Sequence, residues 1–473
     1  MTLFKTLQVL TEAGLHSVPF VTPEGTELLK SFLGMSPRAW YLVVKHMVET
    51  SSALLWMRVK GEAVTSEVLV AKLLQMPKEL NDESSEDTEL VPEIVRVEEA
   101  LGKVYLPVYA YFYHPEMNTE KIPANEDVNS GLWVWSGEEP HSSKDLVVLY
   151  YIHGGGYCFF DGVTSHLELV ANMVEVMQEK LRSDGLRDAA VVAYILSYDT
   201  APEKILPTQL QEVVKGYEFL LSQKRFPIKS DHIVVGGDSA GAALSLGFLK
   251  CLAEHDFCGD LPRPACCLAM EPCVDMSYVA ARKPCDISRD ILSNGMIWYC
   301  VSVLYGRPSH PGERLDTVDR PLESDDYVQK AGRFGDEEWA RVRALAPDGK
   351  MEEHPLFSVA RGKLDPSAFG NVPILLQIGA TEALRGGVDA FATKAREAVC
   401  YEVYDRMIHV FPMFSSVIPL GQIAINRWAD FVSKAIEGEK MPVGQAFAIF
   451  EDTVEPLHKQ DVHPEKAAMA QAA

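Results

Sequence analysis

Ser239 stands where a serine side chain could act as a nucleophile. It is the central residue of the pentapeptide GDSAG (residues 237–241), which follows the apolar run Val234–Gly236 and precedes the helical pattern AALSLGFLKCLAEH. A strand, a tight turn and a helix in this order expose the serine hydroxyl at the end of the strand. The pattern alone is weak, because it arises by chance in roughly one chain in six of this length. Other residues must therefore support the assignment.

A second glycine-rich stretch could supply hydrogen-bond donors for a negatively charged oxygen. The sequence HGGG (residues 153–156) directly follows the apolar run Leu146–Ile152. Consecutive glycines let a loop present backbone N–H groups that no Cβ obstructs. We expect the N–H groups of Gly154, Gly155 and Ala240 to bind the oxyanion of an acyl-transfer intermediate. Losing one such donor typically costs about 2.7–4 kcal/mol of transition-state stabilisation.

Acyl transfer also needs a base that takes the proton of the nucleophile. Of the thirteen histidines, His409 is the best placed, because it follows the apolar run Cys400–Tyr404 near the end of the alternating pattern. His153 lies close to the glycine loop and is expected to brace it. The remaining candidates are expected at the surface or in packing: His166, His255 and His354.

A carboxylate that orients the imidazole completes such a site. The apolar run Ile374–Ile378 ends in a segment that contains Glu382, and a loop there would project this side chain toward His409. Asp389 and Asp405 remain as alternatives. Asp389 falls within a helical pattern and is expected to face solvent. Glu382 is therefore the predicted third member of a Ser-His-Glu triad.

The elements that must position these residues follow from an alternation of apolar runs and helical patterns. Runs that are apolar on both faces, separated by helices, indicate a parallel sheet covered on both sides. The runs cover residues 146–152, 190–196, 233–235, 266–270, 374–378 and 400–404, and the helical patterns include 167–181 and 209–223. Residues 94–113 are expected to form an antiparallel hairpin.

Five motifs together resemble the hormone-sensitive-lipase-like carboxylesterases of the α/β-hydrolase family. They are HGGGY, GDSAG, YDTAPE (residues 198–203), GATEALRGG (379–387) and HVF (409–411). The resemblance implies a mostly parallel eight-stranded sheet flanked by helices, a helical cap, and no metal or organic cofactor. The order of serine, acid and histidine along the chain is the order of that family. The chain departs from it with YDTAPE for YRLAPE, Glu382 for an aspartate, and Val410 for a glycine.

The resemblance also implies a division of the chain. We expect residues 1–90 to be an N-terminal helical segment contributing to the cap, 91–276 the first part of the hydrolase core, 277–354 the cap or insertion, 355–440 the second part of the core, and 441–473 a C-terminal tail.

The predicted function is hydrolysis of carboxylic esters through an acyl-enzyme intermediate. Tyr157, Phe159 and Phe160 beside the glycine loop, with Trp298 in the expected cap, favour an apolar group on the small-molecule ester substrate. Two alternatives stay open: a non-catalytic small-molecule binder on the same fold, and a hydrolase of amides or lactones.

The amino-acid composition restricts the kinds of molecule that the protein is expected to bind. Asp and Glu total 67 against 44 Lys and Arg, a net charge of −23, which repels nucleic acid and anionic membrane surfaces. The nine cysteines contain no CxxC pair and no zinc spacing, so a metal is not expected. No apolar run suits a signal peptide or a membrane span. We therefore expect a cytoplasmic protein, and because relatives of this kind often form dimers, a homodimer is among the expectations.

Overall fold

The computed structural model describes the core of the chain. The described residues are 110, 113–125, 129–140, 145–201, 204, 206–253, 258, 260–276, 290–292, 297, 300, 304, 353–416 and 418–457. Several expectations lie outside them: the helical segment 1–90, nearly all of the hairpin at 94–113, most of the cap 277–354, and Trp298.

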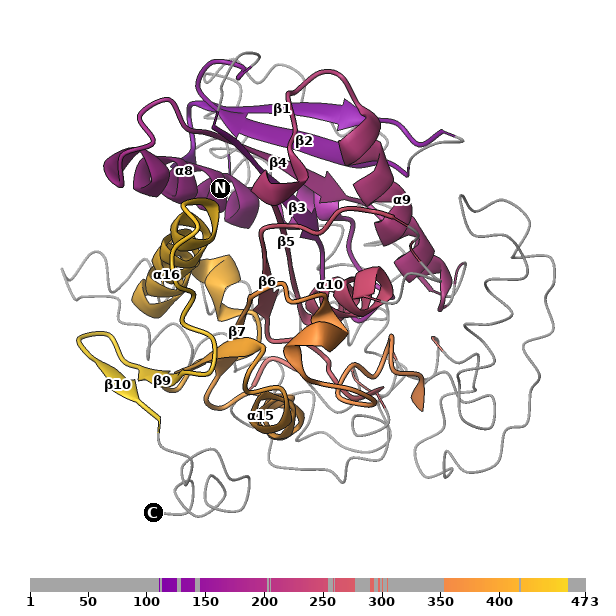
Figure 1. The fold of residues 1–473 in the computed structure, drawn as a ribbon, viewed down its shortest axis with the longest axis vertical. Coiled ribbons are helices and arrows are strands. Elements are labelled where there is room, and N and C mark those ends of the chain that lie inside the picture. Colours follow the sequence, from indigo (N-terminus) through magenta and orange to yellow (C-terminus); the bar gives the residue numbers. More distant parts are fainter. Residues whose placement is uncertain are drawn as a thin grey trace, which may run out of the picture.

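A single sheet organises the described residues (Figure 1). Its ten strands run in the order β1-β2-β4-β3-β5-β6-β7-β8-β9-β10. Strands β3 to β9 are parallel, whereas β1, β2 and β10 pair antiparallel with their neighbours. The bounds are β1 Met117–Ile122, β2 Gly131–Ser136, β3 Leu146–Ile152, β4 Ala190–Leu196, β5 Ile233–Asp238, β6 Cys266–Met270, β7 Ile374–Gly379, β8 Val399–Tyr404, β9 Ala446–Ile449 and β10 Val454–Pro456. The predicted mostly parallel sheet is confirmed.

Strands β9 and β10 extend the sheet beyond the eight strands that the resemblance implies. β9 pairs in parallel with β8, and β10 then closes the edge as an antiparallel hairpin. Both lie within residues 441–473, where a tail was expected. The four residues of β9 are too few to distinguish a strand from a loop by their pattern. They form a strand because β8 on one side and β10 on the other give them hydrogen-bond partners.

Helices cover both faces of the sheet, as the apolar runs predict. Alternate residues of β3 point to opposite faces: Val148 and Tyr150 belong to one apolar cluster, and Leu149 and Tyr151 to another. The first cluster includes residues of α9, α10 and α15, and the second includes residues of α8 and α16, which pack against each other (Figure 1). The helices are α7 Gly162–Ser165, α8 Leu167–Ser183, α9 Thr208–Ser222, α10 Ser239–Ala253, α15 Arg385–Lys394 and α16 Pro419–Ile436, and the 3-10 turns are η1 Ser230–His232, η6 Pro366–Phe369 and η7 Phe411–Phe414.

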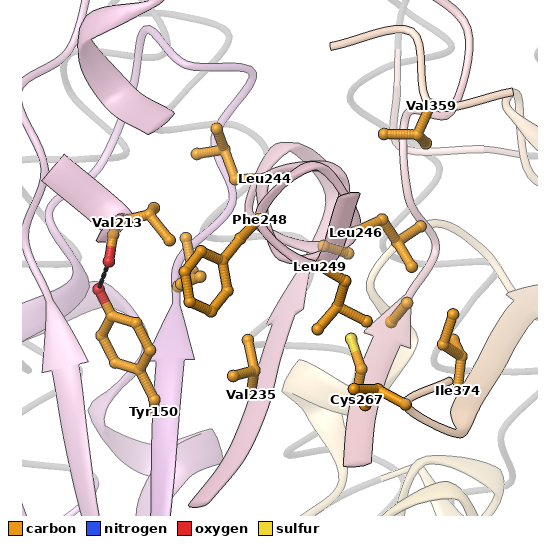
Figure 2. Packing of buried hydrophobic residues seen from close by; sticks show 14 of the residues in the cluster. Tyr150, Val213, Val235, Leu244, Leu246, Phe248, Leu249, Cys267, Val359 and Ile374 are labelled. Atoms are coloured by element: carbon orange, nitrogen blue, oxygen red, sulfur yellow. Dashed lines mark hydrogen bonds between the residues drawn. The ribbon is translucent and has the colours of Figure 1, made fainter. Parts of the chain in front are cut away.

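Helix α10 is anchored directly on the centre of the sheet. Figure 2 shows Phe248 and Leu249 of α10 directed toward Val235 of β5 and Cys267 of β6. Beside them the Tyr150 hydroxyl donates a hydrogen bond of 2.7 Å to the carbonyl of Val213. Burial of an apolar side chain of this size stabilises the folded state by roughly 1.5–3 kcal/mol. The helix that begins at Ser239 is therefore held rigidly on the strands.

In the described part of the chain, no helix combines the length and the apolar character that crossing a bilayer requires.

Candidate active site

Ser239 lies in the sharp turn between β5 and α10. Its φ of 50° falls in the left-handed region, which a residue other than glycine adopts only where the surroundings impose it. A Cβ added at Gly237 or Gly241 would lie 2.2 Å or 2.0 Å from the carbonyl oxygen of Ile152. Both glycines are thus required by close approach of β3, and the turn presents the serine at the carboxyl ends of the strands.

The structure brings the side chains of Ser239, His409 and Glu382 together. Ser239 Oγ lies 2.9 Å from His409 Nε2, and His409 Nδ1 lies 3.3 Å from Glu382 Oε2. These neighbours fix the tautomer: the Nδ1–H donates to the carboxylate, and Nε2 accepts from the hydroxyl. The imidazole is 2 % exposed and Glu382 is 6 % exposed. The arrangement can move a proton from the serine to the imidazole.

The two alternative acids lie elsewhere. Asp389 accepts a hydrogen bond from the Tyr401 hydroxyl and forms an ion pair with Arg385 at 3.3 Å. It is buried rather than facing solvent, because this helix position turns toward β8 and not away from it. Asp405 pairs with Arg406 at 2.9 Å.

Asp290, which no sequence motif contains, links the loop of Glu382 to the loop of His409. Its carboxylate accepts hydrogen bonds from the backbone N–H of His409 at 2.8 Å and of Ala383 at 2.6 Å. Its side chain is buried. No sequence pattern links a residue to backbone groups this far along the chain. Asp290 therefore fixes the distance between the loop of Glu382 and the loop of His409.

The glycine loop differs from the prediction at Gly154. Its N–H donates a hydrogen bond of 3.0 Å to Asp238 Oδ1 and so is not directed at a substrate oxygen, because the loop bends onto the end of β5. Gly155 and Gly156 follow with φ of 107° and 60°. Among the described residues, none accepts a hydrogen bond from the N–H groups of Gly155, Gly156 or Ala240. These three N–H groups are the candidates for oxyanion donors, and Gly156 was not among those that the sequence predicted.

Asp238 is the anchor of that loop. Besides Gly154, it accepts from the Tyr151 hydroxyl at 2.7 Å and lies 3.1 Å from His166 Nε2. Burial acts to raise the pKa of Asp238, but His166 and the hydrogen bond of Tyr151 outweigh it and the pKa is lowered. His166 is thus a buried partner of the loop anchor rather than a surface residue.

His153 braces the loop as expected. Its ring stacks on Tyr198 with centroids 4.1 Å apart, and burial lowers the pKa of His153 to about 4. The ring is therefore neutral at pH 7, and its low pKa makes it a weak base.

The predicted pocket residues divide into two groups. Tyr157 is buried in the cluster that contains α9 and α10, whereas Phe159 packs with Phe160 and Cys300 in a small separate cluster. Both groups flank the glycine loop, so their place beside a substrate stays a prediction.

A further carboxylate, Glu271, lies beside the triad and was also missed. Its Oε2 is 3.6 Å from His409 Nδ1 and accepts a hydrogen bond from the Val410 N–H. Burial raises the pKa of Glu382 to about 7, and burial together with the charge of Glu382 raises the pKa of Glu271 well above its usual range. Burial acts to lower the pKa of His409, but the hydrogen bond to Glu382 outweighs it and the pKa is raised.

Among the described residues, one group offers a metal-like donor set. Ligand atoms of Glu271, Glu382 and His409 lie within 4.8 Å of one another. A cation there would take the Nδ1 lone pair and displace the proton that Nδ1 donates to Glu382. Metal binding and a working triad are therefore mutually exclusive at this place.

Comparison with known proteins identifies the fold. Residues 149–309 match a family model described as alpha/beta hydrolase fold. An acetyl-hydrolase of Streptomyces hygroscopicus is 28% identical over 296 residues, which cover 62% of this chain and 77% of that protein. An arylacetamide deacetylase of Oryctolagus cuniculus is 30% identical over 100 residues, 20% of this chain and 22% of that protein.

Solved structures of esterases have the same architecture. An esterase from the bacterial hormone-sensitive lipase family superposes with a TM-score of 0.53 at 22% identity, covering 78% of this chain and 98% of that one. A hormone-sensitive lipase from a metagenome library gives a TM-score of 0.51 at 19% identity, covering 78% and 98%. These likenesses concern the fold.

Proposed function

We propose that this chain, an α/β-hydrolase similar to the hormone-sensitive-lipase-like esterases, is a serine hydrolase that cleaves carboxylic esters. The observation that carries the proposal is the distance of 2.9 Å between Ser239 Oγ and His409 Nε2 at the carboxyl ends of the strands. A nucleophile and its base within hydrogen-bond reach, with a carboxylate behind the base, are the parts that acyl transfer needs.

The mechanism follows from the placement of each group. His409 Nε2 takes the proton of Ser239 as Oγ attacks the ester carbonyl, and the oxyanion that forms accepts hydrogen bonds from the N–H groups of Gly155, Gly156 and Ala240. The alcohol leaves with the proton from Nε2. Water then attacks the acyl-enzyme with His409 again as base; the bond between Oγ and the acyl group breaks, the carboxylic acid leaves, and Ser239 takes the proton back from Nε2. Glu382 stabilises the imidazolium in both steps, and Asp290 keeps its loop in register with that of His409.

A short acyl group is the proposed substrate class. The acetyl-hydrolase and the arylacetamide deacetylase named above both remove acetyl groups, as their names state. The aromatic side chains of Phe159 and Phe160 beside the glycine loop suit an apolar alcohol part. An aryl acetate is therefore the first substrate to test.

Replacement of Ser239 by alanine tests the proposal. Hydrolysis of p-nitrophenyl acetate should fall by about 10⁴-fold or more, because the covalent route is lost. Ser245→Ala is the matched control, since it removes a buried hydroxyl from the same helix. A fluorophosphonate probe should label the parent and the control but not Ser239→Ala. Undiminished turnover by Ser239→Ala, or absence of labelling in the parent, contradicts the proposal and favours a non-catalytic binder.

The match to an arylacetamide deacetylase supports amide hydrolysis as a second candidate. Phenyl acetate and acetanilide share an acyl group and differ in the leaving atom. Turnover of both, lost together in Ser239→Ala, would extend the proposal to amides; turnover of the ester alone would restrict it.

A further inference from the structure

The carboxyl end of β6 places a second buried carboxylate beside the imidazole of His409. Glu271 follows the last residue of this strand, and its N–H donates a hydrogen bond of 2.8 Å to the carbonyl of Gln377 on β7. Its Oε2 lies 3.6 Å from His409 Nδ1, only slightly farther than the 3.3 Å of Glu382. Two carboxylates from neighbouring strands thus approach the same ring nitrogen.

The backbone of the histidine loop fixes the Glu271 side chain in this position. The N–H of Val410, the residue after His409, donates to Glu271 Oε2, the same oxygen that faces the imidazole. Val410 and Glu271 both have positive φ, 50° and 53°, so each is held in a conformation that the surroundings impose. Glu271 therefore contacts the ring and the chain that carries it.

The two carboxyl groups lie close enough to each other that charge on one disfavours charge on the other. Their facing oxygens and His409 Nδ1 lie within 4.8 Å of one another, and two carboxylates this close and away from water do not both ionise. Burial raises the pKa of both groups. In the described part of the chain, no group donates a hydrogen bond to Oε1 of either one. The titratable groups that face the pair are His409, Asp290, Asp238, Tyr151 and Tyr401.

We propose that Glu271 is a second positioning residue of the triad, able to accept the Nδ1–H of His409 in place of Glu382. The inference rests on the proposed function, because it assigns Glu271 a role in orienting the proposed base. In the parent protein one ionised carboxylate of the pair accepts from Nδ1–H and the other carries the shared proton. Without the charge of Glu382, Glu271 releases its proton to solvent, and the ionised carboxylate accepts the hydrogen bond of His409 Nδ1–H from the β6 side.

A double-mutant cycle tests the inference with kcat/KM for p-nitrophenyl acetate. Loss of the only acid of a triad costs about 10⁴-fold. We expect Glu382→Gln to lose about 10- to 100-fold, Glu271→Gln less than about tenfold, and the double variant about 10⁴-fold, far more than the product of the single losses. A loss of about 10⁴-fold in Glu382→Gln alone, or single losses that simply multiply, would overturn the inference.

The pH profile separates this role from a purely structural one. In Glu382→Gln the acidic limb of kcat/KM should keep the midpoint of the parent, because an ionised Glu271 would take the place of Glu382 in raising the pKa of His409. In the double variant the midpoint should move to lower pH by about a unit or more. A structural role would lower the rate at every pH without moving the midpoint. If the double variant does not fold, the pH profile of Glu382→Gln alone tests the inference. A midpoint of its acidic limb a unit or more below that of the parent overturns the inference.

Two controls complete the design. Glu402→Gln is a matched change at a buried glutamate that bonds Gln377 and Arg427 and not His409, and it should leave the midpoint in place. Ser239→Ala tests the proposed function separately. Loss of activity in Ser239→Ala with multiplicative glutamate losses refutes only the role of Glu271, whereas activity that survives in Ser239→Ala refutes the proposed function itself.

Discussion

Two neighbouring regions of the site bury carboxylates in opposite ways. Asp238, at the end of β5, is surrounded by donors: the Gly154 N–H, the Tyr151 hydroxyl and His166. Glu271 and Glu382, beyond β6 and β7, face each other and a single imidazole, and each has an oxygen that receives no hydrogen bond from a described residue. The pKa is lowered in the first region and raised in the second, although both are buried.

Hydrogen-bond donors, rather than depth, therefore decide which carboxylates stay charged. Asp238, whose pKa is lowered, holds the glycine loop at a fixed place through the Gly154 N–H. In our proposal the two glutamates share a proton and orient the imidazole of His409. Asp238 ends β5 and Glu271 follows the adjacent strand β6. The first fixes the glycine loop, and the second lies beside the imidazole.

The largest expected effect comes from removing the charge of the anchor. Asp238→Asn replaces a carboxylate by an amide and leaves His166 and the Tyr151 hydroxyl without their ionised partner. We expect a loss of about 3 kcal/mol in the free energy of unfolding, because the buried hydrogen bonds that the carboxylate accepts from the Tyr151 hydroxyl and the Gly154 N–H are weakened or lost. Urea denaturation at pH 7 measures it. The matched change Glu271→Gln should cost far less, and equal losses would remove the contrast between the two regions.

Glu271→Gln should have the opposite effect on the free energy of unfolding at high pH: it should stabilise the protein. The raised pKa means that the folded protein keeps a proton that the unfolded chain releases near 4.5. Stability of the parent therefore falls as the pH rises from that value through the raised pKa. Glutamine does not titrate, so the variant should be more stable than the parent at pH 9, by an amount on the order of 1–3 kcal/mol.

Denaturation curves at pH 5, 7 and 9 measure this difference. The same pH dependence in parent and variant would mean that Glu271 is not the group that takes up the proton.

The smallest effect is expected at Val410, the residue that bonds Glu271 through its N–H. A β-branched side chain with φ of 50° and ψ of 33° is strained, and glycine adopts this conformation freely. Val410→Gly should stabilise the protein by about 1 kcal/mol, since relief of strain exceeds the added entropy of the unfolded chain. Thermal denaturation measures it. Asn371→Gly is the control, because asparagine tolerates its φ of 59° and the change should be near zero; destabilisation at Val410 would show that the strain is absent.

The strands at the centre of the sheet were predictable because a strand that is buried on both faces has a continuous run of apolar residues. The apolar runs at 146–152, 190–196 and 266–270 coincide with β3, β4 and β6. Edge strands lack this pattern: β1 reads MNTEKI and buries only Met117, and β9 has four residues. They are strands because a neighbour offers hydrogen-bond partners, and that is a property of the assembled sheet.

The order of residues along the chain determined the kind of chemistry: a serine between glycines after a buried strand, a glycine loop after another, and a histidine and a glutamate after two more. Tertiary structure alone decided which groups face each other. It turned the Gly154 N–H to Asp238, set Asp290 across two loops, and brought Glu271 to the imidazole of His409. The physical reason is that the carboxyl ends of parallel strands lie at one edge of the sheet, whatever the separation of the strands in sequence. Local sequence patterns therefore predict which residues reach this edge, and packing determines which of them contact one another.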